Sequence, residues 1–227
     1  MEEKGKISSV RLILIEIVLV TILSIGMSKL LKVCFSANEA LMTLSIPVIL
    51  IAAAIIPSII HRKDLSQIGF QIGDFSRQVK LLFVTFVIVF PGLFVCVFLL
   101  DHFKIALPMR PIIPEGRSYI WICYQILFVA IPEEFFFRGY LQSNIIYLFN
   151  TLSGKKHRFT HWYGIIICAM IFALSHVILL GSINSIITFF PGLVMGWLFF
   201  RTNSLIAPIL FHSLANIGYG VIATIIA

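Results

Sequence analysis

Charged side chains are scarce in this chain. They make up 12% of its 227 residues, whereas hydrophobic residues make up 59%. So few charges cannot coat the surface of a water-soluble globule of this length. The composition therefore indicates an integral membrane protein, and we expect the lipid bilayer to be its main environment.

Clustered cysteines and a basic stripe are also lacking. The net charge of +7 comes from Lys and Arg residues that lie between apolar runs, so we expect no nucleic-acid partner. The cysteines stand singly, without C-x-x-C spacing, which argues against a disulfide framework or a cysteine metal site. They are Cys34, Cys96, Cys123 and Cys168.

Long apolar runs dominate what is there. About 20 apolar residues suffice for one helix to cross a bilayer. The sequence therefore predicts an all-α, polytopic transmembrane helix bundle of about seven spans, with residues 1–117 holding the first three spans and residues 118–227 a C-terminal helical core. The expected spans are 12–31, 40–60, 81–100, 118–149, 162–180, 183–200 and 204–227.

The fourth run is too long for a straight crossing. Its 32 residues would measure about 48 Å as a helix, against about 30 Å of hydrocarbon, so it must kink, tilt or emerge, and Pro132 is the expected kink. We expect surface or loop segments at 61–80, 101–117 and 150–161.

Basic residues are unevenly divided between the segments that join the spans. Eleven Lys and Arg residues fall on one side and five on the other, which predicts a cytoplasmic N-terminus. The Ile- and Phe-rich, low-charge composition is compatible with a bacterial cell membrane.

Three ionisable residues interrupt the fourth run: Glu133, Glu134 and Arg138. Charge in hydrocarbon costs at least a few kcal/mol and usually marks function. Glu134 and Arg138 are four residues apart and can pair on one helix face. Glu133 is rotated by about 100° from Glu134 and lacks that partner, so we expect it to be free to accept a proton.

Polar residues also occur in the later runs. His176 is a lone imidazole near the end of the fifth run, and His212 and Asn216 are one helical turn apart in the last. Two such donors could hold one oxyanion, although they could equally bond two helices together. Counting helical rises from the expected cytoplasmic edge of each span places Glu133 and His212 about 10 Å deep in the membrane and His176 about 17 Å deep.

Taken in order, these residues form three motifs: Glu133-Glu134-x-x-x-Arg138, Phe172-x-x-x-His176 and His212-x-x-x-Asn216. Over residues 118–219 the chain thereby resembles the CPBP family, which comprises the CAAX prenyl endopeptidases and the bacterial Abi proteins of bacteriocin processing and self-immunity. The first three spans add only a weakly suggestive LSQIGF sequence at 65–70.

The resemblance implies an endopeptidase with its active site within the membrane and a membrane-associated peptide or protein as substrate. By carry-over, Glu133 and His176 activate a water, His212 and Asn216 stabilise the oxyanion, and Glu134 and Arg138 support the site. CAAX-type, bacteriocin and signal-peptide substrates stay open.

Metal dependence also stays open. His176 and His212 with a carboxylate would make an acceptable three-ligand zinc site, yet the sequence has no H-E-x-x-H motif. If Glu133 bound zinc, Glu134 would have to act as the base. We prefer the metal-free glutamate and histidine mechanism, which needs no cofactor.

Two other classes of protein compete with the peptidase. A catalytically silent bacteriocin-immunity or scaffold protein would keep the fold without needing Glu133. A small transporter or proton-coupled channel would use intramembrane Glu and His residues as a relay, but these groups cluster at one depth and no paired broken helices are evident.

Overall fold

The computed structural model describes residues 2–35, 38–61, 69, 71, 73–105, 113, 116–153 and 159–226. Within these residues all regular secondary structure is helical. Seven helical segments are long and apolar enough to cross a membrane, which confirms the predicted fold class. They are Val10–Cys34, Thr43–Ile60, Phe75–His102, Ser118–Ser153, Thr160–Leu180, Ile183–Thr202 and Ile206–Thr224.

The first three helices are α1 (Glu2–Cys34), α2 (Glu39–Ile60) and α3 (Phe75–His102). The α3 helix begins earlier than predicted, so Arg77 and Lys80 lie in its first turns. The reason is local: the side chain of Asp74 accepts a hydrogen bond from the Arg77 amide at 3.0 Å and caps the helix.

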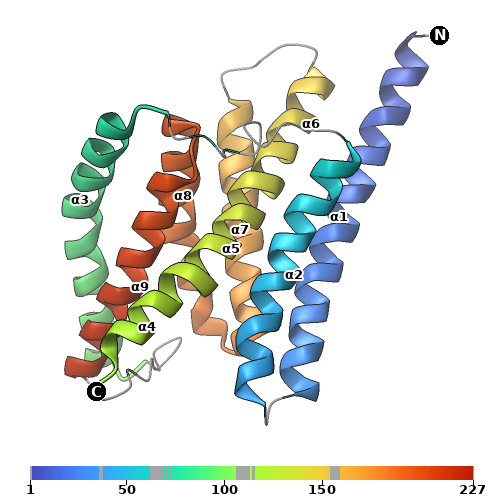
Figure 1. Ribbon diagram of the computed structural model, residues 1–227. Helices are drawn as coiled ribbons and strands as arrows, with labels where there is room; N and C mark the ends of the chain where they lie inside the picture. The colour runs from blue at the N-terminus through green and yellow to red at the C-terminus, as the bar shows by residue number, and fades with distance from the viewer. Residues whose placement is uncertain are drawn as a thin grey trace.

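The fourth span is one continuous helix that changes its winding. It consists of α4 (Ser118–Tyr124), the π-helical segment η2 (Gln125–Ala130), α5 (Ile131–Glu134), the π-helical segment η3 (Phe135–Gln142) and α6 (Ser143–Ser153). The helix continues through Pro132, beside a π segment, and its strong tilt is visible in Figure 1. It also extends to Ser153, into the segment predicted as a basic loop.

The remaining elements are α7 (Thr160–Leu180), the 3₁₀ turn η4 (Ile183–Thr188), α8 (Phe189–Thr202) and α9 (Ile206–Ile226). Gly181 and Asn203 adopt positive φ angles of 70° and 50° and end α7 and α8. The span predicted over 183–200 is confirmed as Ile183–Thr202, although it consists of a 3₁₀ turn followed by an α-helix. The α8 helix has 14 residues, about 21 Å, and the 3₁₀ turn supplies the rest of the crossing.

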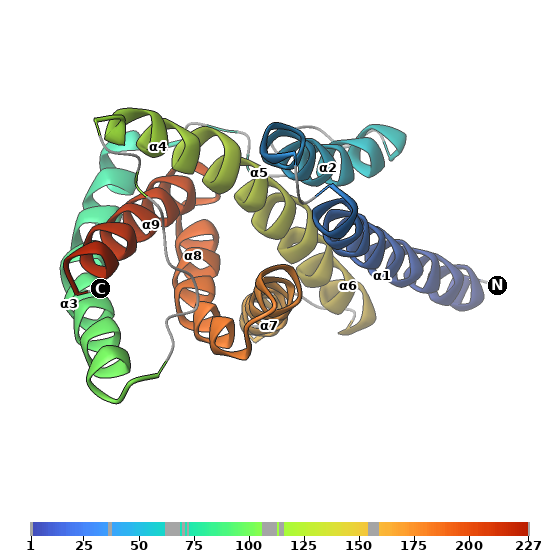
Figure 2. The same cartoon turned by 90° about the horizontal axis from the view of Figure 1, so that it is seen from below.

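The tilted fourth span passes through the middle of the bundle, as Figure 2 shows. On one side α3 packs against α9, and on the other α2 packs against both α1 and η3. The buried core between them includes Phe136, Phe172, Met195 and Phe211. This arrangement brings α5, α7 and α9 together at the predicted site residues.

Some predictions fall beyond the described residues. Of the 65–70 sequence only Gly69 is described, and its carbonyl accepts a hydrogen bond from the Leu205 amide at 3.1 Å. Much of the expected loops over 101–117 and 150–161 is likewise not described. The division of the chain at residue 117 stays a prediction.

Candidate active site

The predicted ion pair between Glu134 and Arg138 is fully buried. Nε of Arg138 lies 3.2 Å from Oε2 of Glu134, and both side chains are 0% exposed. The guanidinium also donates to the Gly192 carbonyl from Nη2 at 3.3 Å and lies 4.8 Å from the centre of the Phe172 ring. The pair therefore anchors the fourth span to α7 and α8, and neither charge is left alone in the apolar interior.

Glu134 has a second partner that the sequence did not reveal. Its Oε1 lies 2.9 Å from Nδ1 of His212, a residue of α9. A carboxylate paired with Arg138 can only accept, so Nδ1 of His212 carries the proton of this hydrogen bond. The other ring nitrogen, Nε2, is left to face Glu133. Glu134 thus orients a histidine as well as pairing with Arg138.

His176 is oriented in the same way by its own helix. Its Nδ1 lies 3.0 Å from the carbonyl oxygen of Phe172, which can only accept, so Nδ1 donates and Nε2 is left to face Glu133. The Phe172 ring packs against both imidazoles, with its centre 4.4 Å from that of His176 and 6.0 Å from that of His212. One aromatic side chain therefore fixes the spacing of the two histidines.

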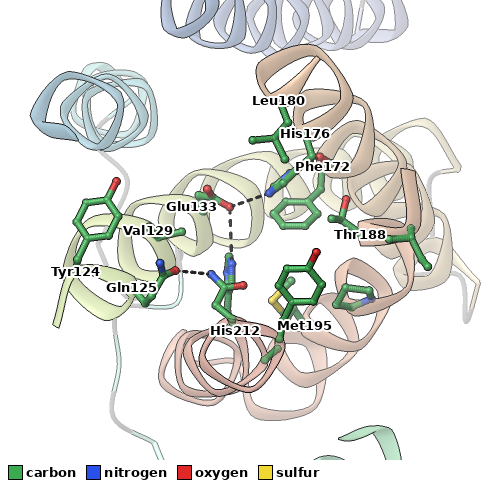
Figure 3. Close-up of a pocket in the computed structure, with 15 residues that line it drawn as sticks. Tyr124, Gln125, Val129, Glu133, Phe172, His176, Leu180, Thr188, Met195 and His212 are labelled. Atoms are coloured by element: carbon green, nitrogen blue, oxygen red, sulfur yellow. Dashed lines mark hydrogen bonds and ion pairs between the residues drawn. The ribbon is translucent and has the colours of Figure 1, made fainter. Parts of the chain in front are cut away.

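The two histidines converge on a single oxygen atom. Nε2 of His176 and Nε2 of His212 each lie 3.9 Å from Oε2 of Glu133 (Figure 3). That distance is too long for a direct hydrogen bond, but an oxygen atom can lie about 2.8 Å from each member of either pair. The geometry can therefore bind a water between the carboxylate and the imidazoles. His176 therefore lies close to Glu133 even though the sequence placed the two residues at different depths.

Asn216 occupies the same cavity but is not wholly free. Its Nδ2 donates to Oε1 of Gln125 at 3.0 Å, an interaction drawn in Figure 3. This hydrogen bond uses one of the two hydrogens of the amide and leaves the other for the oxyanion role that the sequence predicts for Asn216. Gln125 is buried and was missed. The sequence feature that could have revealed Gln125 is that it is a lone amide side chain in the apolar run before Glu133.

The π-helical segments help to align these groups. Gln125, Val129 and Glu133 are four residues apart and all line one cavity. In an α-helix that spacing drifts around the axis, whereas a π-helical turn holds more residues and keeps them closer to one face. The unusual winding of the fourth span therefore presents Gln125 and Glu133 to the same space.

Two cavities meet at Glu133 and His176. One, of about 310 Å³, extends toward α8 and α9, and the other, of about 400 Å³, extends toward α1 and α2. Both are mainly apolar, and Glu133 lines both of them. The residues that line both are Tyr124, Val129, Glu133, His176 and Leu180.

The side chains at the site include types that can bind a metal ion. Among the described residues no group of three or more His, Cys, Asp or Glu side chains is placed to hold a metal ion. His176 and His212 are the right ligand types, but with Glu133 they do not form a zinc site in this arrangement.

Comparison with known proteins supports the resemblance. Residues 115–218 match the family model described as Type II CAAX prenyl endopeptidase Rce1-like, and these residues include all six predicted site residues. No match was found among curated proteins or among solved structures. The matched segment of this integral membrane protein is thus similar to the Rce1-like type II CAAX prenyl endopeptidases, and its resemblance to the CPBP family is confirmed.

Proposed function

We propose that this protein is an intramembrane endopeptidase that uses water activated by Glu133 and His176. The observation that carries the proposal is the convergence of two imidazole Nε2 atoms on one buried carboxylate oxygen, each at 3.9 Å. Oε2 of Glu133 has no direct hydrogen-bond partner among the described residues. A water bound there would have the two to four polar partners that a buried water needs.

In the proposed reaction the bound water attacks the carbonyl carbon of the scissile peptide bond. Glu133 accepts a proton from the water as the carbon–oxygen bond forms. His176 Nε2 accepts a hydrogen bond from the other hydrogen of the water. The carbonyl oxygen becomes an oxyanion. When the carbon–nitrogen bond breaks, Glu133 returns its proton to the leaving amine, so the carboxylate is regenerated for the next cycle.

His212 and Asn216 are assigned to the oxyanion. Because Nδ1 of His212 donates to Glu134, its Nε2 can donate to an oxyanion only if the ring is protonated. Glu134 supplies the balancing negative charge. When His212 is protonated, the positive charges of His212 and Arg138 balance the negative charges of two carboxylates. These are Glu133 and Glu134, so the cluster as a whole is neutral. The second amide hydrogen of Asn216 provides the other donor.

The surroundings of the site and the family description both support the proposed substrate class. Apolar cavities within a membrane protein suit a membrane-associated peptide. A CAAX-type C-terminus is the first class to test because the matched family is named for it. Bacteriocin leaders and signal peptides form the second class. The mechanism proposed is metal-free, and the competing function is a catalytically silent immunity or scaffold protein.

The proposal is tested with purified protein in lipid nanodiscs and a panel of membrane peptides from these classes. Cleavage is followed by mass spectrometry for wild type, Glu133→Gln and Glu16→Gln. Glu16 is the matched control, because it is also a carboxylate in a transmembrane helix but contacts His61 and Tyr140, away from both cavities.

We expect wild type and Glu16→Gln to cleave at least one class and Glu133→Gln to lose at least a thousandfold in kcat. Thermal unfolding of each variant verifies that it is folded. Cleavage that survives in Glu133→Gln would refute the assigned base. Binding of a peptide by wild type, with no cleavage of any peptide on the panel, would favour the scaffold function.

A further inference from the structure

A lysine of the first helix lies beside the candidate active site. Lys32 is near the end of α1, outside the segment that matches the family model. Its Nζ donates to the Leu179 carbonyl at 2.8 Å, and its side chain lines the 400 Å³ cavity together with Glu133 and His176. Lysines near the end of a span usually extend to the aqueous interface. This one borders a cavity that reaches the reacting groups.

The ammonium group has bonding capacity left over. It carries three donors, and the Leu179 carbonyl takes one of them. Among the described residues no carboxylate lies within ion-pair distance of Lys32. The cavity walls around it are largely apolar and include Ile46, Pro47 and Phe128. An anion brought into this space would therefore meet a partly buried cation flanked by apolar side chains.

The position of Lys32 relative to the two cavities is specific. Of the residues that line the two cavities, Lys32 is the sole Lys or Arg among those described, and it lies in the cavity that extends away from His212 and Asn216. A peptide lying across Glu133 would place one end in this cavity. A free chain terminus carries a carboxylate, which is the anion that an ammonium group binds there.

We propose that Lys32 binds the C-terminal carboxylate of the peptide substrate and so makes the enzyme select bonds close to a free C-terminus. The leaving fragment then occupies the cavity between α1, α2 and α7, and the rest of the substrate occupies the cavity beside α8 and α9. This inference rests on the proposed peptidase function. The competing role for Lys32 is purely structural, because a cation also stabilises the C-terminal end of a helix such as α7.

The test uses one cleavable peptide sequence in two forms, with a free C-terminal carboxylate and with a C-terminal amide. The proteins are wild type, Lys32→Met, Lys32→Arg and Lys29→Met, in phosphatidylcholine nanodiscs that carry no net charge. Lys29 is the matched control, because it is also a lysine near the end of α1 but lines neither cavity. The readout is the ratio of kcat/KM for the acid to that for the amide.

We expect wild type, Lys32→Arg and Lys29→Met to prefer the acid by about tenfold or more, in line with a charge-assisted hydrogen bond. Lys32→Met should bring the ratio close to one. Equal cleavage of both peptides by wild type would overturn the proposal. So would an equal loss with both peptides in Lys32→Met, which is the signature of a purely structural role.

A binding measurement separates this proposal from the proposed function. The affinity of the acid and amide peptides is measured for Glu133→Gln and for Glu133→Gln/Lys32→Met, neither of which needs to cleave. Tighter binding of the acid to the first protein, lost in the second, supports the lysine site even if the chemistry assigned to Glu133 is wrong. Equal affinity for both peptides in the first protein overturns the lysine site alone.

Discussion

Nδ1 of His212 lies 2.9 Å from Oε1 of Glu134, although the two residues are 78 positions apart in the chain. This hydrogen bond joins the fourth span to α9 and turns the other nitrogen of the ring toward Glu133. It also makes Glu134 more than a partner of Arg138. Each role assigned to His212 therefore depends on the neighbouring carboxylate being present and ionised.

Glu134→Gln is expected to lower both stability and activity. The substitution leaves Arg138 buried without a countercharge, which costs about 3–5 kcal/mol in comparable buried pairs. It also removes the negative charge beside His212, so kcat should fall by about a hundredfold or more. Thermal unfolding in detergent and peptide cleavage measure the two effects.

The double variant Glu134→Gln/Arg138→Met provides the control for that prediction. Removing both charges should restore part of the lost stability without restoring activity, because the unpaired guanidinium is gone while His212 still lacks its carboxylate. Full activity in either variant would contradict the role given to Glu134.

Gln125→Met is expected to lower kcat by about tenfold with little change in KM. The loss corresponds to about one hydrogen bond, since the Asn216 amide would no longer be held by the Gln125 side chain. Gln142→Met is the matched control, because Gln142 is a buried amide in the same span that donates to the Gly196 carbonyl at 3.0 Å and lines neither active-site cavity. The Gln142→Met variant should be less stable than wild type but have an unchanged kcat. An equal fall in kcat in both variants would argue against positioning by Gln125.

Cleavage is expected to resist metal chelators. The donors among the described residues are not arranged to hold a metal ion, and the proposed steps need only water and protein groups. Elemental analysis of purified, active protein should find well under one zinc per chain. One zinc per chain, together with cleavage that a chelator abolishes and zinc restores, would make His176 and His212 ligands and overturn the metal-free mechanism.

The two ends of the chain are expected to lie on opposite sides of the membrane, with the N-terminus in the cytoplasm. Seven spans require opposite sides, and the excess of Lys and Arg residues predicts which side is cytoplasmic. A reporter that is active solely in the cytoplasm, fused to either terminus, measures this. Activity at both termini would show an even number of crossings, and activity at the C-terminus alone would reverse the orientation.

Much of the fold could be predicted because hydropathy is a strong and local signal. Each apolar run is long enough to identify a span without any knowledge of its neighbours. The ends of the helices were less accurate, since the cap at Asp74 and the left-handed residue Asn203 act through single side-chain or backbone conformations. The π-helical winding around Glu133 has no simple signature in the sequence and could not be foreseen.

The sequence by itself determined the membrane class, the number of spans, the match to an endopeptidase family and the residue types of the candidate site, because composition and motif spacing are local properties of the chain. The i, i+4 pairing of Glu134 with Arg138 was readable for the same reason. Only the tertiary structure decided that His176 and His212 face one oxygen of Glu133, that Gln125 binds Asn216 and that Lys32 borders the cavity. Those relationships depend on how tilted helices far apart in the chain are packed, and no spacing along one helix specifies them.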